Sequence, residues 1–317
     1  MDIEWIILIC VLAAALVVLI AAYVCFYRIF RKPKKKQHEE GYIEIPEGEI
    51  YEVHREQIEE WVKAARAMPH RDVEIKSFDG LTLRGKYYES FPGAPIELML
   101  HGYQGNAERD MTGGIFRSRD CGHNALLVNH RASGDSEGKV ITFGINESRD
   151  CLAWIDYILT EIDPNAKIIL TGISMGAATV MNVSGMELPE NIIGVLADCG
   201  YTSNEDIIKK VIREMHLPAN ILYPFARLGA RIFGGFNLDE FAPVAQVKKS
   251  KIPTIFFHGD ADDFVPHYMS EKNFEACAAK KKLVIVKGAG HGIAYPVDKE
   301  YYLKEAREFF KNIESKA

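Results

Sequence analysis

The chain has 317 residues, with a hydrophobic fraction of 48% and a charged fraction of 26%, as in an ordinary folded protein and unlike a disordered or collagen-like chain. Its net charge of −6 is unevenly distributed, with −2 over residues 1–27, +6 over residues 28–36 and −10 over the remainder. This acidic globular part argues against nucleic-acid binding, because contacts to phosphates need a basic surface.

The first predicted element is an apolar segment, residues 5–27, that contains no charged side chain. At about 1.5 Å per residue, a helix of this length crosses the roughly 30 Å hydrocarbon core of a bilayer. The alternatives are a buried core helix and a cleaved signal peptide, but a signal peptide normally begins with basic residues and this chain begins with Asp2 and Glu4. We therefore expect a retained single-pass anchor with a basic flank over residues 1–36.

All the basic residues of the flank follow the apolar segment, namely Arg28, Arg31, Lys32, Lys34, Lys35 and Lys36. Lys and Arg favour the cytoplasmic side of a membrane, so we expect the globular domain to lie in the cytoplasm. The same side chains are placed to contact anionic headgroups. The six cysteines show no paired spacing, which argues against a disulfide framework and against a CxxC metal site.

Residues 37–71 are predicted to form a linker or a helical arm. Within it, residues 51–67 show helical spacing, with a shared apolar face made by Val53, Ile58, Trp61, Val62 and Ala65. This helix either packs on the domain or lies at the membrane surface.

From residue 72 onward, short apolar segments alternate with helical patterns. A hairpin is expected where residues 73–78 and 81–88 flank Asp79-Gly80. Other strands are predicted at residues 96–100, 125–128, 167–170, 193–196, 254–257 and 283–286, and helices at residues 147–162 and 298–313. This alternation predicts one α/β domain over residues 72–317, with a mostly parallel central sheet and helices on both faces. The alternation stops at residues 200–250, which form either a lid over a pocket or ordinary core-covering helices.

A candidate nucleophile lies in Gly172-Ile173-Ser174-Met175-Gly176, between a predicted strand and a helix that starts with small residues. A serine hydroxyl is a weak nucleophile, so it needs a neighbouring base and a position clear of its own backbone. A sharp strand-to-helix turn provides that position, and Gly172 and Gly176 relieve the crowding. The pattern predicts that Ser174 attacks an acyl carbon.

The base and the acid of this chemistry are expected later in the chain. His291 follows a predicted strand in the loop GAGHG, and an imidazole can pass the serine proton to the leaving group. The predicted acid is Asp262, in HGDADDFVP, which would fix the tautomer of the histidine. Asp198 is an alternative acid, and the remaining acids of the second loop, Asp260 and Asp263, are predicted to form the loop or to be solvated.

The oxyanion hole is expected in His101-Gly102-Tyr103-Gln104-Gly105-Asn106, which follows an early strand. The backbone N–H of Tyr103 is expected to act with that of Met175 on the developing negative charge. His101 and Gly102 are predicted to support this loop. Both His101 and His258 end strands before a glycine, so we interpret both as structural.

Two other patterns indicate different chemistry and are weaker. The acidic loop around Asp262 lacks the Gly and the distal Glu of a Ca²⁺ loop. Ser136-Glu137-Gly138-Lys139 matches the S-x-x-K pattern of penicillin-interacting enzymes, but it lies in a glycine-rich loop and no SDN or KTG motif follows. We expect neither a metal nor an organic cofactor.

Together the motifs HGYQGN, GISMG, HGDADDFVP and GAGHG resemble the α/β-hydrolase superfamily, in particular membrane-anchored bacterial serine hydrolases related to serine aminopeptidases and Bem46-like proteins. The resemblance covers about residues 72–314. It implies an α/β-hydrolase fold in which Ser174 is the nucleophile, Asp262 the acid and His291 the base, with oxyanion donors at Tyr103 and Met175. The usual RGxGxSxG loop of the family appears as residues 131–138 with Ala132 in place of the first glycine, which affects loop geometry.

The sequence therefore predicts a membrane-tethered serine hydrolase that cleaves a carboxylic ester of a small or lipid-like acyl substrate through an acyl-enzyme. A serine peptidase or aminopeptidase and an acyltransferase are alternatives, as are amide or thioester bonds, because a fold does not name a substrate. A non-catalytic, membrane-tethered binding protein is an alternative from another class, although a binding protein has no need of all three triad groups.

Overall fold

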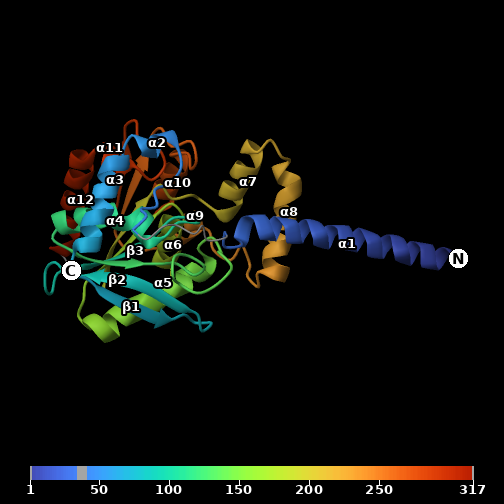
Figure 1. The fold of residues 1–317 in the computed structure, drawn as a ribbon, viewed down its shortest axis with the longest axis horizontal. Coiled ribbons are helices and arrows are strands. Elements are labelled where there is room, and N and C mark those ends of the chain that lie inside the picture. The colour runs from blue at the N-terminus through green and yellow to red at the C-terminus, as the bar shows by residue number, and fades with distance from the viewer. Residues whose placement is uncertain (1, 34–40, 316–317) are drawn as a thin grey trace.

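The computed structural model describes residues 2–33 and 41–315, so the predicted headgroup contacts of Lys34, Lys35 and Lys36 lie outside the described residues. Within the described ranges, eight strands form one sheet in the order β1-β2-β4-β3-β5-β6-β7-β8 (Figure 1). The strands are β1 Arg71–Lys76, β2 Thr82–Tyr88, β3 Ile96–Leu100, β4 Asn124–Val128, β5 Ile168–Ile173, β6 Ile192–Asp198, β7 Thr254–Gly259 and β8 Lys281–Val286.

The sheet is antiparallel at one edge and parallel elsewhere. Strand β2 pairs antiparallel with β1 and with β4, whereas the pairs from β4 through β3 to β8 are parallel. The predicted hairpin is therefore confirmed, with a turn that includes Gly80 at φ +88°. Because the carboxyl ends of parallel strands meet at one edge, the loops that leave β3, β5, β6, β7 and β8 come together there.

Helices cover both faces of the sheet. One face carries α5 Ile145–Tyr157, which continues as the π-helical turn η1 Ile158–Ile162, together with α6 Met175–Ser184 and α10 Tyr268–Ala276. The other face carries α4 Ala107–Asp120, α11 Ala294–Val297 and α12 Lys299–Glu314. Strands β3, β4 and β7 are consequently buried along their whole length, which explains why their sequences are mainly apolar and do not alternate with polar residues. The predicted layered α/β architecture is confirmed.

The predicted arm packs on the domain and does not form one continuous helix. A short helix α2, Glu49–Glu52, is separated from α3, Arg55–Ala67, and the intervening Val53 is 81% exposed instead of lying on the apolar face. The Trp61 ring of α3 stacks on Phe116 and Tyr295, with ring centroids 6.4 and 5.4 Å apart. Of the two positions considered for this helix, α3 takes the one against the domain.

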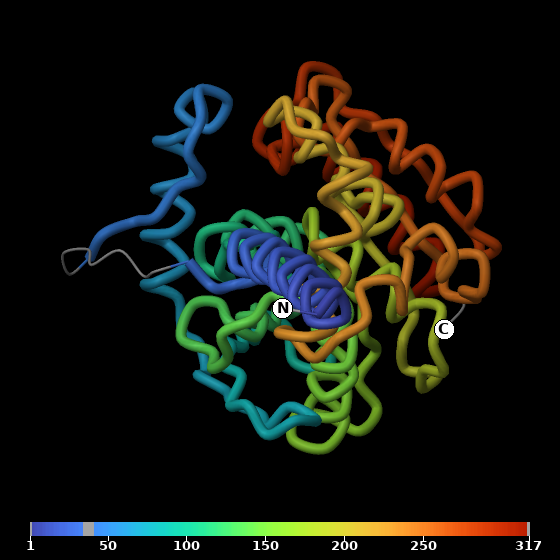
Figure 2. Tube along the Cα trace, turned by 90° about the vertical axis from the view of Figure 1, so that its right-hand side faces the viewer, coloured from blue at the N-terminus to red at the C-terminus, as the bar shows by residue number. Residues whose placement is uncertain are grey.

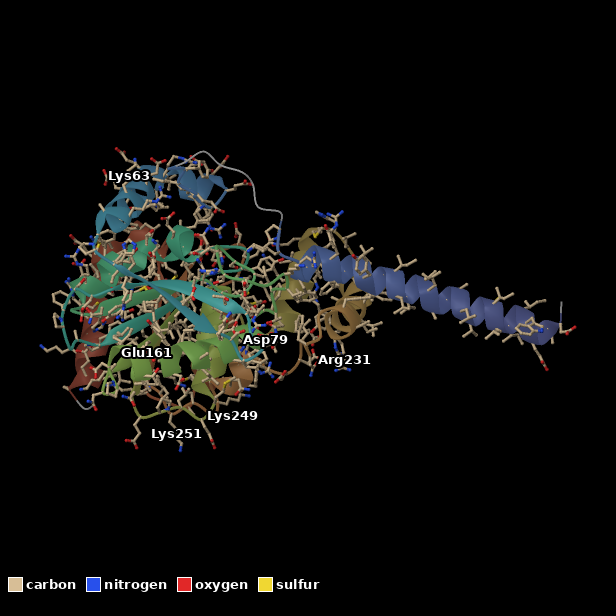
Figure 3. All side chains as sticks on the ribbon, turned by 60° about the horizontal axis from the view of Figure 1, so that its bottom comes forward. Lys63, Asp79, Glu161, Arg231, Lys249 and Lys251 are labelled. Atoms are coloured by element: carbon tan, nitrogen blue, oxygen red, sulfur yellow. The ribbon has the colours of Figure 1, made fainter. Side chains whose placement is uncertain are left out.

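The N-terminal helix α1, Ile3–Phe30, projects from the domain (Figures 1 and 3). Among residues 2–33 and 41–315 it alone is long and apolar enough to cross a membrane, by length and composition. Its last turns are anchored in the domain, because Ala22, Phe26 and Phe30 are buried and the Ile141 N–H donates to the Phe30 carbonyl at 2.7 Å. The helix is thus attached to the domain by packing as well as by the chain.

Residues 200–250 are mostly helical and form a cap beside α1. The cap contains α7 Asn204–Glu214, α8 Ala219–Phe233 and α9 Pro243–Gln246. Figure 2, viewed along the projecting helix, shows α8 crossing close to α1, and the two helices pack against each other. Apolar residues of the cap, including Tyr223, Ala226 and Ala230, form one core cluster with Phe26 and Phe30 of α1.

Candidate active site

Ser174 occupies a strained turn between β5 and α6. Its backbone angles are φ +55° and ψ −113°, a conformation that L-residues rarely adopt. A Cβ at Gly172 would lie 2.2 Å from the Gly176 carbonyl oxygen, and a Cβ at Gly176 would lie 2.0 Å from that of Leu100. Both flanking glycines are therefore required by backbone contacts that cannot shift. The Ser174 N–H donates to the Asp198 carbonyl at 2.8 Å, which ties the turn to β6.

The Ser174 hydroxyl, the imidazole of His291 and the carboxylate of Asp262 form one continuous hydrogen-bonded line. Asp262 Oδ2 lies 2.7 Å from His291 Nδ1, and His291 Nε2 lies 2.9 Å from Ser174 Oγ. An ionised carboxylate only accepts hydrogen bonds, so Nδ1 carries the imidazole proton and Nε2 accepts from the serine hydroxyl. This is the tautomer that a general base needs.

Asp198, the alternative acid, has a different partner. Its Oδ2 accepts from the Tyr302 hydroxyl at 2.9 Å, and its side chain makes no hydrogen bond to His291 within the part of the chain that the structure describes. Burial, the largest influence, raises the pKa of Asp198. The hydrogen bond to His291 is made by Asp262.

The carboxylate of Asp262 is buried and fully engaged. Its Oδ1 accepts from the backbone N–H groups of Phe264 at 2.9 Å and Val265 at 2.8 Å, while its Oδ2 also lies 3.2 Å from His258 Nε2. Burial favours a raised pKa, but the hydrogen bonds from His258, His291 and Val265 outweigh it and hold the pKa of Asp262 well below its usual range. The group is therefore charged throughout the neutral pH range.

His258 and His101 hold loops in place, in keeping with their predicted structural character. His258 Nε2 contacts the Val265 carbonyl at 2.7 Å, and its Nδ1 lies 2.6 Å from the Ser270 hydroxyl. His101 Nε2 accepts from the His130 N–H at 3.0 Å. Burial, followed by the nearby His130, lowers the pKa of His101 to about 3, so it stays neutral.

The loop predicted to supply an oxyanion donor passes directly against Ser174. A Cβ at Gly102 would lie 3.5 Å from the Ser174 Cβ, and the Gly102 N–H donates to Asp110 Oδ2 at 3.0 Å. Asp110 in turn accepts from Arg109 Nε at 2.6 Å. Burial favours a raised pKa for Asp110, but the charge and hydrogen bond of Arg109 lower it overall, so a charged carboxylate anchors this loop.

The two predicted oxyanion donors belong to the two segments next to Ser174, which are the loop that contains Gly102 and the first turn of α6. Tyr103 follows Gly102, and Met175 opens α6, where first-turn N–H groups have no intrahelical acceptor. The Tyr103 hydroxyl donates to the Ile29 carbonyl of α1 at 2.6 Å. The oxyanion loop is thereby joined to the end of the N-terminal helix.

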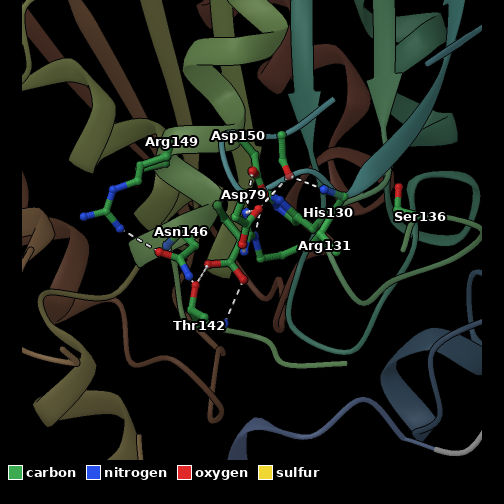
Figure 4. A network of polar contacts seen from close by, with 12 residues as sticks. Asp79, His130, Arg131, Ser136, Thr142, Asn146, Arg149 and Asp150 are labelled. Atoms are coloured by element: carbon green, nitrogen blue, oxygen red, sulfur yellow. Dashed lines mark hydrogen bonds and ion pairs between the residues drawn. The ribbon is translucent and has the colours of Figure 1, made fainter. Parts of the chain in front are cut away.

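The loop of residues 131–138 is structural in this molecule (Figure 4). Arg131 pairs with Asp150 at 2.7 Å and with Asp79 at 2.9 Å, which joins the loop to α5 and to the β1–β2 turn. Ser136 Oγ accepts from the Arg84 N–H and donates to the Asn129 carbonyl, both at 2.9 Å. These bonds fit a loop support better than the S-x-x-K alternative. Ala132 adopts φ +59°, in the left-handed region that favours glycine, so the alanine at this position holds a strained backbone conformation.

A cavity of about 570 Å³ opens at Ser174 and His291. Its walls come from the arm, from α4, from the end of β6 and from α11, and its aromatic lining includes Tyr51, Trp61, Tyr103, Phe264 and Tyr295. None of its lining residues belongs to residues 200–250 in the described chain, so the predicted lid does not cover this cavity; that segment packs on α1 instead.

The arm lies over the cavity, where the lid alternative would have placed residues 200–250. The Tyr51 hydroxyl donates to the His291 carbonyl at 2.9 Å, and a Cβ at Gly290 would lie 2.9 Å from Ile50. Sequence reasoning missed Tyr51, Ile50 and Asp110. An acid on the first turn of the helix after HGYQGN was a usable signal for Asp110, whereas the contact between Tyr51 and His291 joins segments 240 residues apart and leaves no local pattern.

One cluster within the described residues has metal-ligand atoms in reach of one another: Cys199, Asp262 and His291, within 4.8 Å. The carboxylate and the imidazole are hydrogen-bonded to each other. Burial, followed by the neighbouring Asp198 and Asp262, raises the pKa of Cys199 well above its usual value, which keeps the thiol protonated. The carboxylate and the imidazole of this cluster are already engaged in the hydrogen-bonded line with Ser174.

A sheet of this order with a strained serine turn at its carboxyl edge defines the chain as an α/β-hydrolase. A sequence model of the prolyl oligopeptidase family matches residues 142–316, more than half of the chain. The chain belongs to the prolyl oligopeptidase family.

Known proteins agree with this assignment. YqkD of Bacillus subtilis, an uncharacterized protein, is 28% identical over 195 residues, which cover 61% of this chain and 64% of YqkD, just under two thirds of its length. Bem46 of Schizosaccharomyces pombe is 24% identical over 221 residues, 68% of each chain. The solved structure of the Pyrococcus furiosus esterase Pf2001 superposes with a TM-score of 0.65 at 23% identity, covering 79% of this chain and 93% of the esterase. The predicted superfamily and the Bem46-like resemblance are confirmed.

Proposed function

We propose that this enzyme is a serine hydrolase that cleaves a carboxylic ester through a triad of Ser174, His291 and Asp262. The observation that carries the proposal is the hydrogen-bonded line from Ser174 Oγ to His291 at 2.9 Å and on to Asp262 at 2.7 Å. All three side chains reach this line from different loops at the carboxyl edge of the sheet, where α/β folds bind ligands.

In the first step, Ser174 Oγ attacks the substrate carbonyl while His291 Nε2 takes its proton. The resulting imidazolium stays beside the charged Asp262, which stabilises it without taking the proton. The backbone N–H groups of Tyr103 and Met175 are proposed to hold the developing oxyanion, since the first turn of α6 directs positive partial charge to this point.

In the second step, His291 returns the proton to the leaving alcohol and the acyl group remains on Ser174. A water molecule then attacks the acyl carbon while His291 takes one of the water protons. The bond between the acyl carbon and Ser174 Oγ breaks, His291 gives the proton to Oγ, and the acid is released. Every proton in this reaction is transferred through His291 Nε2. The tautomer set by Asp262 matters because it leaves Nε2 free to accept a proton.

The substrate proposed for this site is a small or lipid-like acyl ester. The cavity of about 570 Å³ lies within the range of small-molecule sites and is lined by aromatic side chains around Ser174. Membership of a peptidase family supports a second candidate, a serine peptidase or aminopeptidase that attacks an amide at the same serine. An acyltransferase would use the same acyl-enzyme, with another alcohol in place of water.

Hydrolysis assays test both candidates together. p-Nitrophenyl esters of two to twelve carbons and aminoacyl p-nitroanilides are offered to the wild type, to Ser174→Ala and to the matched control Ser90→Ala, in the β2–β3 loop. We expect ester turnover that falls by about 10⁶ in Ser174→Ala and is unchanged in the control. Faster turnover of the anilides would favour the peptidase. Equal turnover by wild type and Ser174→Ala would contradict a catalytic serine, and turnover no faster than in buffer for both proteins would favour the binding protein.

We further propose that α1 holds the enzyme in a membrane as a single-pass anchor with the domain on the cytoplasmic side. The helix has the length and composition of a span, and the basic residues Arg28, Arg31 and Lys32 stand on the domain side of it. Protease added to intact cells should leave the domain intact. Digestion under these conditions would contradict the orientation.

A further inference from the structure

The membrane-length part of α1 ends where the cap begins. Residues 3–20 are exposed, whereas Ala22 and Phe26 are buried against α8. The contact is close, since a Cβ at Gly229 of α8 would lie 2.3 Å from the Ala22 carbonyl oxygen. The Phe233 ring also meets the Tyr23 ring edge-on at 5.2 Å. Figures 1 and 2 show α8 crossing α1 at this level.

The depth of a bilayer matches this boundary. Residues 3–20 make about 27 Å of helix, close to the roughly 30 Å of a hydrocarbon core. Exposed aromatic residues stand at both ends of this length, Trp5 at 59% and Tyr23 at 50%, as in the aromatic belts of membrane proteins. The bilayer surface on the domain side therefore falls at residues 21–26, the level at which α8 crosses.

The outer surface of the cap is unusually apolar. Between residues 41 and 315 the structure has thirteen large hydrophobic side chains that are exposed, and five of them lie within residues 215–233. These five, which we call the cap face, are Met215 at 63%, Leu217 at 43%, Ile221 at 61%, Ile232 at 50% and Phe233 at 39%. Apolar surface grouped in this way indicates an interaction site.

The charges of α8 identify the partner. The helix contains Arg227 and Arg231 and no acidic residue. Arg227 pairs with Asp239 at 2.7 Å, and Arg231 reaches Asn237 at 3.3 Å. The two arginines line a shallow groove of about 190 Å³ with Pro224, Leu228 and Asn237. Apolar side chains next to guanidinium groups suit the interface of a bilayer that contains anionic phospholipids.

We infer that the cap is a second membrane contact: α8 lies in the interface of the bilayer that α1 spans, with the cap face among the acyl chains and Arg227 and Arg231 at lipid phosphates. The inference rests on the proposed anchor. It also brings the bilayer surface close to the active site, because α7 carries Lys210, which donates to the Asp263 carbonyl and lies 5.5 Å from the ring of Phe264. Phe264 lines the cavity and contacts the His291 ring at 5.0 Å.

Depth-dependent quenching tests the inference on the full chain in vesicles. Ile221→Cys and Ile232→Cys are made in a background where Cys10, Cys25 and Cys121 are alanine, and are labelled with an environment-sensitive fluorophore. Lys251→Cys, which is exposed and lies outside the cap (Figure 3), is the matched control. With phosphatidylcholine and phosphatidylglycerol vesicles carrying a shallow spin-labelled lipid, we expect at least twofold quenching at 221 and 232 and none at 251. Equal signals at all three positions would overturn the inference.

A label at Leu12→Cys separates this result from failure of the anchor. Quenching by a deep spin-labelled lipid at position 12 without quenching at 221 and 232 would refute the cap contact and leave the anchor standing, whereas no quenching at 12 would refute both. Ester hydrolysis measured in the same samples reports on the proposed function independently. In Arg227→Gln/Arg231→Gln, the gain in quenching caused by phosphatidylglycerol should disappear; an unchanged gain would contradict the role of the arginines.

Discussion

Replacing Asp262 with Asn changes one atom of the proposed triad and should stop the reaction. The side-chain oxygen that accepts from the Phe264 and Val265 N–H groups at 2.9 and 2.8 Å should remain in place. The new NH₂ group then faces His291 Nδ1, 2.7 Å from the replaced oxygen. Because that group donates, Nδ1 must become the acceptor and the imidazole proton must move to Nε2. Nε2 then points its proton at Ser174 and can no longer accept one.

The loss should appear in kcat and not in KM, because Asp262 is absent from the lining of the cavity. We expect kcat to fall by about 10⁴, equivalent to about 5 kcal/mol of transition-state stabilisation, the size of effect seen when a serine-protease acid becomes an amide. The assay is steady-state hydrolysis of the best p-nitrophenyl ester. Asp260→Asn, two residues away and exposed, is the control and should retain wild-type kcat.

The alternative acid, Asp198, provides the comparison that can refute this prediction. If folded Asp262→Asn keeps kcat within about tenfold of the wild type while Asp198→Asn loses it, the acid is Asp198 and the reasoning about the tautomer is wrong. Circular dichroism of both variants establishes that each is folded before the rates are compared.

Two further predictions concern stability. Burial favours a lowered pKa for His123, but hydrogen bonds from its ring to Glu314 and Glu97 raise the pKa to about 9. Between about pH 6.5 and pH 9 the folded state therefore keeps a proton that the unfolded state loses. The stability that this histidine contributes is fully present below about pH 6.5 and falls by up to about 3 kcal/mol as the pH rises to about 9. Denaturant unfolding across this window should show the decline in the wild type and in exposed His216→Gln, and a nearly flat profile in His123→Gln; a wild-type profile that rises with pH would contradict the sign. Gly176→Ala places a Cβ 2.0 Å from the Leu100 carbonyl oxygen. Thermal unfolding should therefore show that the free energy of unfolding falls by about 3 kcal/mol or more. An unchanged Tm would mean that the turn can relax around the added methyl group.

The sheet was predictable from the sequence, and the residues of the proposed site could be named from it, because both leave local signals. Strand β3 falls on the predicted residues 96–100, since a strand buried on both faces appears as a short apolar run. The geometry around Ser174 was predictable because only glycine fits at positions 172 and 176. His291 and Asp262 followed from chain order and from the loops that carry them, and the structure brings both to Ser174.

The covering of the cavity was not predictable in this way. Aromatic and apolar residues of the cap resemble those of a lid, yet they are used to hold α1, as the contact of Gly229 with Ala22 shows. The position of Tyr51 over His291 depends on how the arm returns across the domain. Periodicity reports which face of a helix is buried and does not say against which partner.

Reaction with a fluorophosphonate, followed by peptide mass spectrometry, tests directly whether Ser174 attacks the acyl carbon. We expect a single adduct on the hydroxyl of Ser174, formed rapidly by the wild type, far more slowly by His291→Ala, and not at all by Ser174→Ala. An adduct on any other residue, or equal labelling of wild type and Ser174→Ala, would contradict it.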